Sequence, residues 1–442
     1  MRALAAAALA LALFVPSGAR AAEPAADDSL DLYLHQMADS TDEYFGDATA
    51  GFDTTGLDSL IGVGGIAGRR AHGPRLRPFP VLRYHRAEGA VAGGGARLAP
   101  PGGGVLEGSG SYGFSNKGGR YAAGYRRTLL LRRERRRAEV DPFAAGHIGD
   151  GMRVDVYVRY ARETLPFMPE HATPTFGSAS ALASGDVRQS VYESRGVTTG
   201  LEAWLGDWRL RAGFRHARER AMPLATTYTL FKTGRVVGNV AADDDEYSEG
   251  FGGLAFLRRD WDLAATIDGR DGGGDRWRLR GALGKGFRVT SEFRLTLQGE
   301  YGAAASLAPR QRRFEVGGPR ALPTLPYNAA SGDHVLLGTA ELLWGRGLFE
   351  ALGIGHPRWL VLQPYAFVES GAAWDAGRDI VFSKPPSRAF QEDAGLGLAL
   401  RTGFPEPDTY LRLFIAVPLS EESDVVRLGL GIRAPLDLVG RL

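Results

Sequence analysis

The chain has no cysteine among its 442 residues, so neither a disulfide nor a cysteine-based metal site can form. Its charge is nearly balanced, since 53 Lys and Arg against 51 Asp and Glu leave a formal net charge of +2. This balance gives no reason to expect nucleic acid or a strongly acidic partner. After residue 21 the sequence also lacks an apolar run of the roughly 18 residues that a membrane helix needs. That absence leaves strands open, because a barrel distributes its apolar residues in alternation.

The first 21 residues have the pattern of a secretory signal peptide. Arg2 precedes an apolar run from 3 to 15, and Ala19-Arg20-Ala21 provides a small-x-small cleavage site. The pattern predicts that the mature chain leaves the cytoplasm. The segment from 22 to 79 is acidic at first and then rich in Gly and Pro, and we interpret it as an N-terminal tail or plug.

From residue 80 to 442 the sequence alternates between apolar and other residues in short segments bounded by turn residues. Glycine makes up 61 of 442 residues, about twice its usual share of about 7%. The segments with a period of two lie at 81–89, 105–114, 120–131, 151–164, 191–205, 207–219, 248–258, 260–268, 276–286, 289–303, 310–316, 334–344, 358–374, 393–402, 409–419 and 425–434. About sixteen strands predict an all-β fold, a transmembrane antiparallel β-barrel, because bacterial barrels have an even strand number in this range.

The segment from 409 to 419 shows the alternation most clearly, because one of its faces is wholly apolar and the other is mixed or small. The first face consists of Leu411, Leu413, Ile415 and Val417, and the second of Arg412, Phe414 and Ala416. Lipid outside and water inside would produce this pattern. All seven Trp lie near the ends of predicted strands, as in the aromatic girdles of barrels, although Trp also favours sheets in general.

One connection does not fit the predicted strand order. The alternation of strand directions assigns 167–189 to the end of the barrel with short periplasmic turns, yet it has 23 residues and is rich in Pro, Ser and Ala. Either the strand pairing near it is misassigned, or a small insertion lies at that end.

The stretch from 310 to 341 joins two alternating segments through a part rich in Gly, Pro and Asn. This part also contains the apolar residues Leu322, Leu325 and Tyr327, which need something to pack against. In a membrane barrel the available place is the lumen. The adjacent Gly317 and Gly318 would let the chain turn inward and approach the wall, although they also fit an ordinary bulge at a barrel rim.

The order Arg-Phe-x-x-Gly-Gly, Leu, an aromatic residue, Gly-Asp and a strand with Glu resembles the bacterial surface antigen family, the barrel domain of outer-membrane assembly factors of the BamA and TamA type. The matching positions are Arg313, Phe314, Gly317, Gly318, Leu322, Tyr327, Gly332, Asp333 and Glu341. The resemblance implies a loop that folds into the lumen between strands eleven and twelve. It also implies a protein in the outer membrane of a Gram-negative-type bacterium that assists insertion or translocation of proteins or lipids. Unfolded outer-membrane proteins would be its clients, and it would need no cofactor.

Three features depart from that family. Its loop tip has an Arg-Gly-aromatic triplet whose arginine pairs with an acid on the inner wall, whereas this chain has Leu325-Pro326-Tyr327. Because Pro326 cannot donate such a contact, either Arg320 takes this role or the contact is lost. The segment from 22 to 79 is too short for periplasmic POTRA repeats, and the chain ends in Leu442 rather than an aromatic residue.

A basic run after the third predicted strand is a candidate contact for lipopolysaccharide. If it lies in an outward-facing loop, its guanidinium groups could bind phosphates in bidentate fashion, and otherwise it is a solvated hairpin end. It consists of Arg132, Arg133, Arg135, Arg136 and Arg137.

An acidic cluster gathers oxygen ligands of the kind that divalent cations prefer. It consists of Asp243, Asp244, Asp245, Glu246 and Glu249. Because it lacks the spacing of a calcium loop, we interpret it as a solvated turn and predict no metal site.

Catalytic motifs are scarce. The chain has no Gly-x-Ser-x-Gly elbow, and His85, His216, His334 and His356 stand singly, with no His-Glu-x-x-His pair. We therefore do not expect an enzyme. Two alternatives stay open: a passive pore or structural barrel with the loop as a plug, and a barrel enzyme that acts on lipid through a site assembled from distant strands.

Overall fold

The computed structural model describes residues 75–100, 104–132, 152–167, 190–226, 228, 239–258, 261–270, 277–306, 308–318, 321–326, 329–354, 361–377, 381–401, 410–419 and 426–433. The predicted signal peptide and the predicted tail up to residue 74 lie outside these ranges. Among the described residues, no helix is both long enough and apolar enough to cross a membrane.

The chain forms one 16-stranded antiparallel sheet in which each strand pairs with the next along the sequence. Its strands are β1 (Arg75–His85), β2 (Gly89–Ala99), β3 (Val105–Gly113), β4 (Gly118–Arg132), β5 (Met152–Pro166), β6 (Val191–Leu205), β7 (Trp208–Ala221), β8 (Asp245–Arg258), β9 (Trp261–Arg270), β10 (Trp277–Arg288), β11 (Phe293–Ala304), β14 (His334–Trp344), β15 (Val361–Trp374), β16 (Gln391–Arg401), β17 (Tyr410–Pro418) and β18 (Arg427–Arg433). The predicted all-β fold with about sixteen strands is confirmed.

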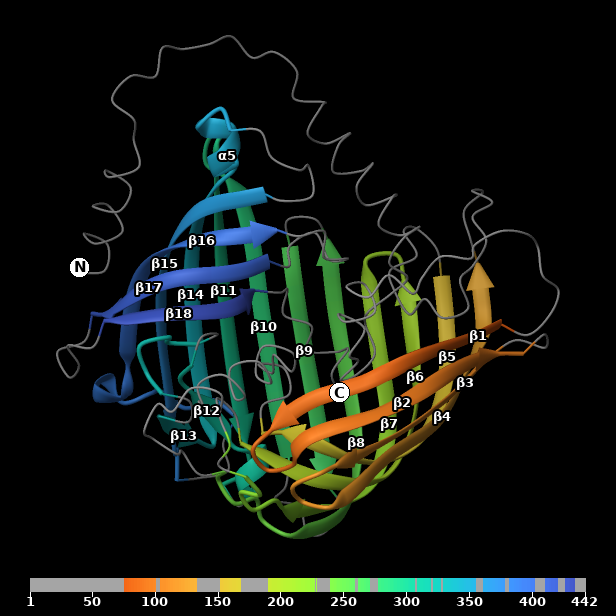
Figure 1. The fold of residues 1–442 in the computed structure, drawn as a ribbon. Helices are drawn as coiled ribbons and strands as arrows, with labels where there is room; N and C mark the ends of the chain where they lie inside the picture. Colours follow the sequence, from red (N-terminus) through yellow and green to blue (C-terminus); the bar gives the residue numbers. More distant parts are fainter. Residues whose placement is uncertain are drawn as a thin grey trace.

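Among the described residues, five short elements lie between these strands: η2 (Arg310–Arg312), β12 (Phe314–Val316), β13 (Ala330–Gly332), α5 (Leu348–Ala351) and η3 (Ser387–Ala389). β12 and β13 form a separate two-stranded sheet between the eleventh and twelfth strands of the large sheet. Figure 1 shows the large sheet curling strongly, with orange β1 and β2 in front of green β7–β10 and blue β15–β18 forming the left wall. β1 and β18 are the two terminal strands of the sheet order.

The predicted strand count is correct, but one predicted strand is wrong and one observed strand was missed. β2 was not predicted, because Gly93, Gly94 and Gly95 hide its alternation, and 310–316 is not a strand of the large sheet. The glycines have a packing reason: a Cβ at Gly95 would lie 2.4 Å from the Phe79 ring of β1. The sheet also begins at Arg75 rather than near residue 80.

The additional strand resolves the misfit at 167–189. With β2 counted, the β5–β6 connection lies at the same end of the sheet as the connection that holds β12 and β13. We call this end, which also contains the β1–β2 turn, the loop end. The β4–β5 connection then lies at the opposite end, together with the start of β1 and the end of β18.

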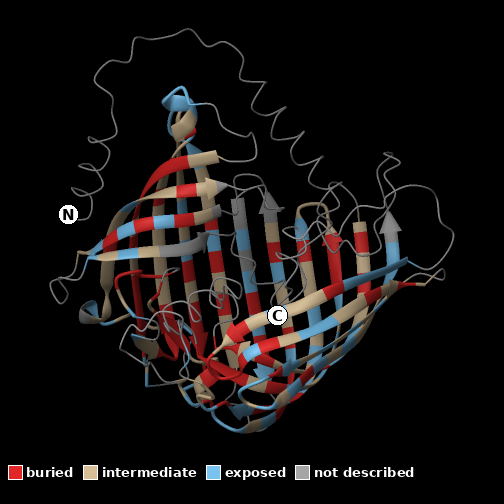
Figure 2. Ribbon diagram, in the orientation of Figure 1, coloured by how far each residue is buried: buried red, intermediate tan, exposed pale blue. Residues whose placement is uncertain are grey.

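Burial follows the predicted alternation along the strands, as the stripes in Figure 2 show. In β17, Arg412 and Phe414 are 1% and 2% exposed, whereas Leu413 and Ile415 are 45% and 53% exposed. The girdle interpretation is wrong for Trp204, which is buried on the polar face of β6. Trp374, on the other face of β15, is also buried, because its ring packs 5.4 Å from the His334 ring and its Nε1 donates to Ser383 Oγ at 3.2 Å.

Candidate functional site

The polarity of the sheet is inverted relative to a water-soluble protein. The largest fully buried side chains are mostly polar or charged, among them Arg86, Arg412, His334, Gln311, Glu88, Glu202, Glu219 and Glu249. Large apolar side chains on the other face are exposed, among them Leu106, Val158, Phe214, Leu263, Ile267, Leu283, Leu413 and Ile415. Exposed apolar and enclosed polar faces are the arrangement of a β-barrel with lipid around it.

The described residues between 305 and 333, which we call the inner segment, pack against the polar face at the loop end. Their β12–β13 ladder pairs Phe314 with Gly332 and Val316 with Ala330. Phe314 and Leu322 are fully buried, in one cluster with Val335 of β14 and Ala373 of β15. Leu322, which was predicted to need a packing partner, therefore packs against the sheet wall.

One side of the inner segment is tied to β7 and β8. Arg312 of η2 donates through Nη2 to the Glu249 carboxylate at 3.1 Å and to the Tyr247 hydroxyl at 2.8 Å. Gln311 donates to Glu219 Oε2 at 2.8 Å. Since Arg312, Glu219 and Glu249 are all largely buried, these are charge-assisted contacts shielded from water.

The other side of the inner segment is tied to β15 and β16. The backbone N–H of Leu322 donates to Glu369 Oε2 at 3.0 Å, and that of Thr324 donates to Asp393 Oδ2 at 2.8 Å. Arg427 of β18 also donates to the Leu325 carbonyl at 3.0 Å. The inner segment thus connects strands from both halves of the sheet, including the terminal strand β18.

Beneath this contact, Arg412 of β17 lies in a cage of aromatic rings and acids. Its guanidinium carbon is 4.8 Å from the Phe367 ring centre and 5.2 Å from that of Tyr365. Its nitrogens lie 3.4 Å from Glu369 and 4.0 Å from Glu341. Arg412 therefore holds Glu369, the acceptor for Leu322, in place.

The two predicted glycines adopt backbone conformations that favour glycine over other residues. Gly317 and Gly318 have φ angles of 122° and 91°, which side chains disfavour. A Cβ at Gly317 would lie 2.0 Å from the Pro326 carbonyl oxygen. The glycine pair therefore lets the inner segment reverse on itself, with Gly318 N–H donating to the Leu325 carbonyl at 3.2 Å.

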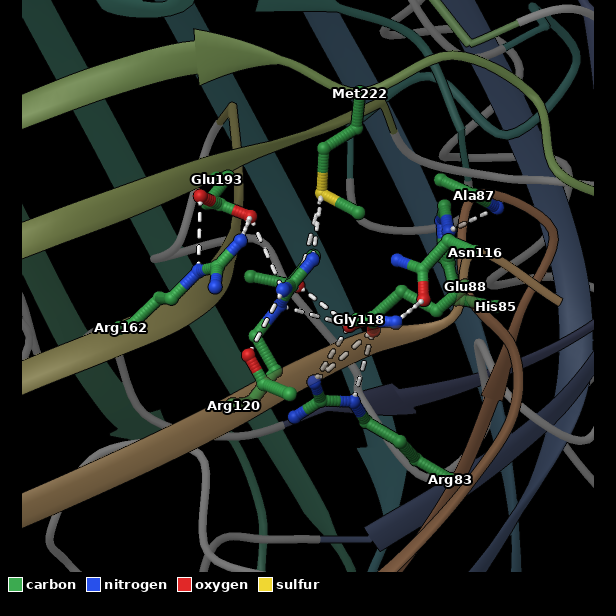
Figure 3. Close-up of polar contacts among 12 residues, drawn as sticks. Arg83, His85, Ala87, Glu88, Asn116, Gly118, Arg120, Arg162, Glu193 and Met222 are labelled. Carbon is green, nitrogen blue, oxygen red and sulfur yellow. Dashed lines mark hydrogen bonds and ion pairs between the residues drawn. The ribbon is translucent and has the colours of Figure 1, made fainter. Parts of the chain in front are cut away.

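A second buried polar cluster surrounds Glu88 in the β1–β2 turn (Figure 3). Arg83 and Arg120 lie 3.0 and 3.2 Å from its carboxylate, and Thr164 donates to it at 2.7 Å. Burial opposes the ionisation of Glu88, but these partners hold its pKa below its usual value. Glu193 lies between Arg120 and Arg162, at 3.0 and 3.1 Å. The cluster ties the turn after the first strand to β4, β5 and β6.

The remaining predicted residues fall into three groups. Arg313 pairs with Asp375, and buried Asp333 accepts hydrogen bonds from His334 Nδ1 and the Ala376 N–H at 2.6 and 2.9 Å. Gly332 is required by a close approach, because a Cβ there would lie 2.2 Å from the Trp374 carbonyl oxygen. Arg320 and Tyr327 lie outside the described residues, as do Arg133, Arg135, Arg136, Arg137 and the side chain of Arg132.

Contact of the basic run with lipopolysaccharide stays a prediction. β4, at whose last residue this run begins, ends at the side of the sheet opposite the inner segment. The acidic cluster is divided: Asp243 accepts from the Arg310 N–H at 2.7 Å, while Glu249 pairs with Arg312 and Arg215. The described residues contain no group of His, Asp or Glu that could hold a metal ion.

Sequence reasoning missed the residues that hold the inner segment, namely Gln311, Arg312, Thr324, Glu219, Glu369, Asp393, Arg412 and Arg427. One signal was available for the acids: Glu219, Glu249 and Glu369 are carboxylates at the polar-face positions of predicted strands. Such a carboxylate needs a partner in the lumen.

We expect Glu315→Gln to remove a pH-dependent loss of stability. Burial in β12 raises the pKa of Glu315 from 4.5 to about 7, although Arg310 lowers it. Because the folded state binds this proton more tightly than the unfolded state, stability falls as pH rises from 4.5 to about 7 and stays low above it. The loss amounts to roughly 3 kcal/mol at about 1.4 kcal/mol per pH unit.

Urea unfolding at about pH 5 and about pH 8 measures this effect. Glu292→Gln, in the exposed β10–β11 connection, serves as the control. An equal pH slope for Glu315→Gln and the unmodified protein would contradict the raised pKa of this buried carboxyl.

No protein-family model matches the sequence, and no curated protein matches it. Among solved structures, it is similar to BamA from Haemophilus ducreyi lacking POTRA domains 1–3, with 12% identity over 81% of this chain and 69% of that chain and a TM-score of 0.48. It is also similar to CdiB from Acinetobacter baumannii (12% identity, 81% and 59% covered, TM-score 0.36) and CdiB from Escherichia coli (14%, 83% and 62%, 0.38). The chain thus spans less than two thirds of either CdiB chain.

Proposed function

We propose that this chain is an outer-membrane β-barrel protein that assists the insertion or translocation of proteins at that membrane. The observation that supports this most is the inner segment, tied by buried charges to β7 and β8 on one side and to β15, β16 and β18 on the other. A segment that contacts the last strand can couple events in the lumen to the meeting of β1 and β18.

The physical basis of the activity would be strand addition. In lipid every backbone polar group needs a partner, so an incomplete closure between the terminal strands offers an edge to an unfolded strand. β18 has only 7 residues, while β1 has 11, including Pro78 and Pro80, which lack an N–H donor. Unfolded outer-membrane proteins are the proposed clients, and no enzymatic activity is proposed.

The substitution Ile415→Arg tests the membrane location separately from the proposed activity. Ile415 is 53% exposed near the middle of β17. In lipid we expect the variant to be destabilised by about 2–3 kcal/mol, because arginine on the lipid face of a barrel loses hydration. Unfolding from lipid bilayers measures the change, and Leu352→Arg, at an exposed position after α5, is the control. A change within about 0.5 kcal/mol, as at a water-exposed site, would argue against a lipid-facing surface.

The proposed activity is tested by disulfide trapping between the terminal strands, in a chain with no cysteine of its own. One cysteine replaces Leu82 of β1 and the other replaces Leu428 of β18, two positions on the exposed face of the sheet near the loop end. We expect the disulfide to form in the isolated protein and an unfolded barrel client to reduce its yield. Ile415→Cys with Leu428→Cys, which face each other in the β17–β18 ladder, should form a disulfide whether or not the client is present.

If the client leaves the Leu82–Leu428 disulfide unchanged while the control pair forms normally, the proposal of strand addition fails. Single-channel conductance would then examine the passive pore. Loss of a lipid-modifying activity on replacement of a single histidine would instead identify a barrel enzyme.

A further inference from the structure

Three arginines lie side by side on the exposed face of the sheet, near the loop end. Arg162 of β5 is directly opposite Arg195 of β6, and Arg195 is directly opposite Arg218 of β7. Tyr121 of β4 is the next member of the same row. We call Arg162, Arg195 and Arg218 the arginine row.

The arginine row has little compensating charge. Arg195 donates to the Tyr160 hydroxyl at 2.9 Å, and neither Arg195 nor Arg218 forms an ion pair with an acid of the described part of the chain. Arg162 pairs with Glu193, as Figure 3 shows. Glu246 faces Arg218 across the β7–β8 ladder, and Arg220 faces Glu193. The three arginines of the row and the nearby Arg220 are thus matched by two glutamates, Glu193 and Glu246.

The arginine row lies at the boundary of the apolar surface. The adjacent row toward the middle of the sheet contains Tyr160, Val197 and His216. The row after that contains Val158 and Phe214, which are 45% and 47% exposed, with Thr199 between them. From the loop end toward the middle of the sheet, the rows are therefore charged, then aromatic and polar, then apolar. The layers at the surface of a bilayer follow the same order.

Like charges directly opposite each other destabilise a sheet, and here two such pairs follow one another. An anion between the guanidinium groups removes this repulsion. Guanidinium groups bind phosphate in a bidentate fork, and residues opposite each other on neighbouring strands are about 5 Å apart, close enough to share one phosphate.

We propose that the arginine row, with Tyr121 and Tyr160, binds the phosphate groups of a membrane lipid whose acyl chains cover the apolar surface around Val158, Val197 and Phe214. The site rests on the proposed membrane location. It uses none of the residues that hold the inner segment, so client insertion and lipid binding can fail independently. A lipid is favoured over a free anion because the apolar surface begins next to the charges.

The test measures binding to the full chain in a nonionic detergent. The probes are bis-phosphorylated lipid A, lipid A without its phosphates, and inorganic phosphate. We expect Arg195→Gln with Arg218→Gln to weaken binding of the phosphorylated lipid by about tenfold or more, as loss of two charge-assisted contacts requires. Lys117→Gln with Arg127→Gln removes the same charge from exposed positions outside the row and should leave binding unchanged.

Thermal unfolding provides a second readout that also reports whether the variant folds. Without lipid, the Arg195 and Arg218 double variant should melt at or above the temperature of the unmodified protein, since the repulsion is gone. With phosphorylated lipid A, the unmodified protein should melt higher than the variant, because ligand binding stabilises the folded state.

Three results would overturn the proposal: equal lipid affinity of the double variant and the unmodified protein, equal binding of lipid A without phosphates, or the same thermal stabilisation by inorganic phosphate alone.

Discussion

Replacing Arg412 with Ala is expected to destabilise the protein by about 3–5 kcal/mol, because the change leaves buried carboxylates without their cation. Arg412 is 1% exposed and lies between Glu369 and Glu341. Its Nε also donates to the Tyr365 hydroxyl at 3.0 Å. The loss should extend to the inner segment, because Glu369 accepts the Leu322 N–H.

Equilibrium unfolding in urea measures the effect, and Arg127→Ala, at an exposed arginine of β4, provides the control. Arg412→Lys should recover only part of the loss, since an ammonium group keeps the charge without the planar fork. Combining Arg412→Met with Glu369→Gln should cost less than Arg412→Met alone, because the double variant buries one charge fewer. A loss below about 1 kcal/mol for Arg412→Ala would show that water already reaches these acids.

Replacing Gly317 with Val is expected to release the inner segment from the sheet wall while the large sheet persists. A φ of 122° strains any branched side chain, and a Cβ would overlap the Pro326 carbonyl oxygen at 2.0 Å. The combined cost should reach at least about 3 kcal/mol, which exceeds what the contacts of Leu322 and Thr324 can offset.

Limited proteolysis measures this release as new cleavage between residues 305 and 333, with circular dichroism reporting the intact sheet. Gly299→Val is the matched control, because Gly299 of β11 has an ordinary φ and open space around its Cβ position. Equal resistance of Gly317→Val and Gly299→Val to protease would mean that the segment does not depend on this reversal.

Much of the fold follows from local patterns. A period of two along 409–419 predicts which face of β17 is apolar, and the burial of Arg412 and exposure of Ile415 agree with it. Gly317, Gly318 and Gly332 were identified from the sequence motif, and backbone conformation or close approach explains each of them. The first prediction succeeds because side-chain alternation along a strand is a local property, whereas the glycine positions came from the family resemblance.

Other features are not local. β2 escapes sequence reasoning because its glycines are selected by the neighbouring Phe79 ring rather than by strand propensity. Its omission assigned the 167–189 connection to the wrong end of the sheet. Trp204 resembles a girdle residue in sequence, yet it is buried against Arg209, whose guanidinium carbon is 4.3 Å from its ring centre.

The sequence by itself determined a chain of about sixteen alternating strands with one apolar face, together with an irregular stretch between the eleventh and twelfth strands. Only the tertiary structure decided which acids hold that stretch: Glu219 and Glu249 on one side, Glu369 and Asp393 on the other. It alone also aligned Arg162, Arg195 and Arg218. The physical reason is that partners such as Arg312 and Glu249 are 63 residues apart. Register and curvature of the whole sheet bring them together, and no short sequence window contains that information.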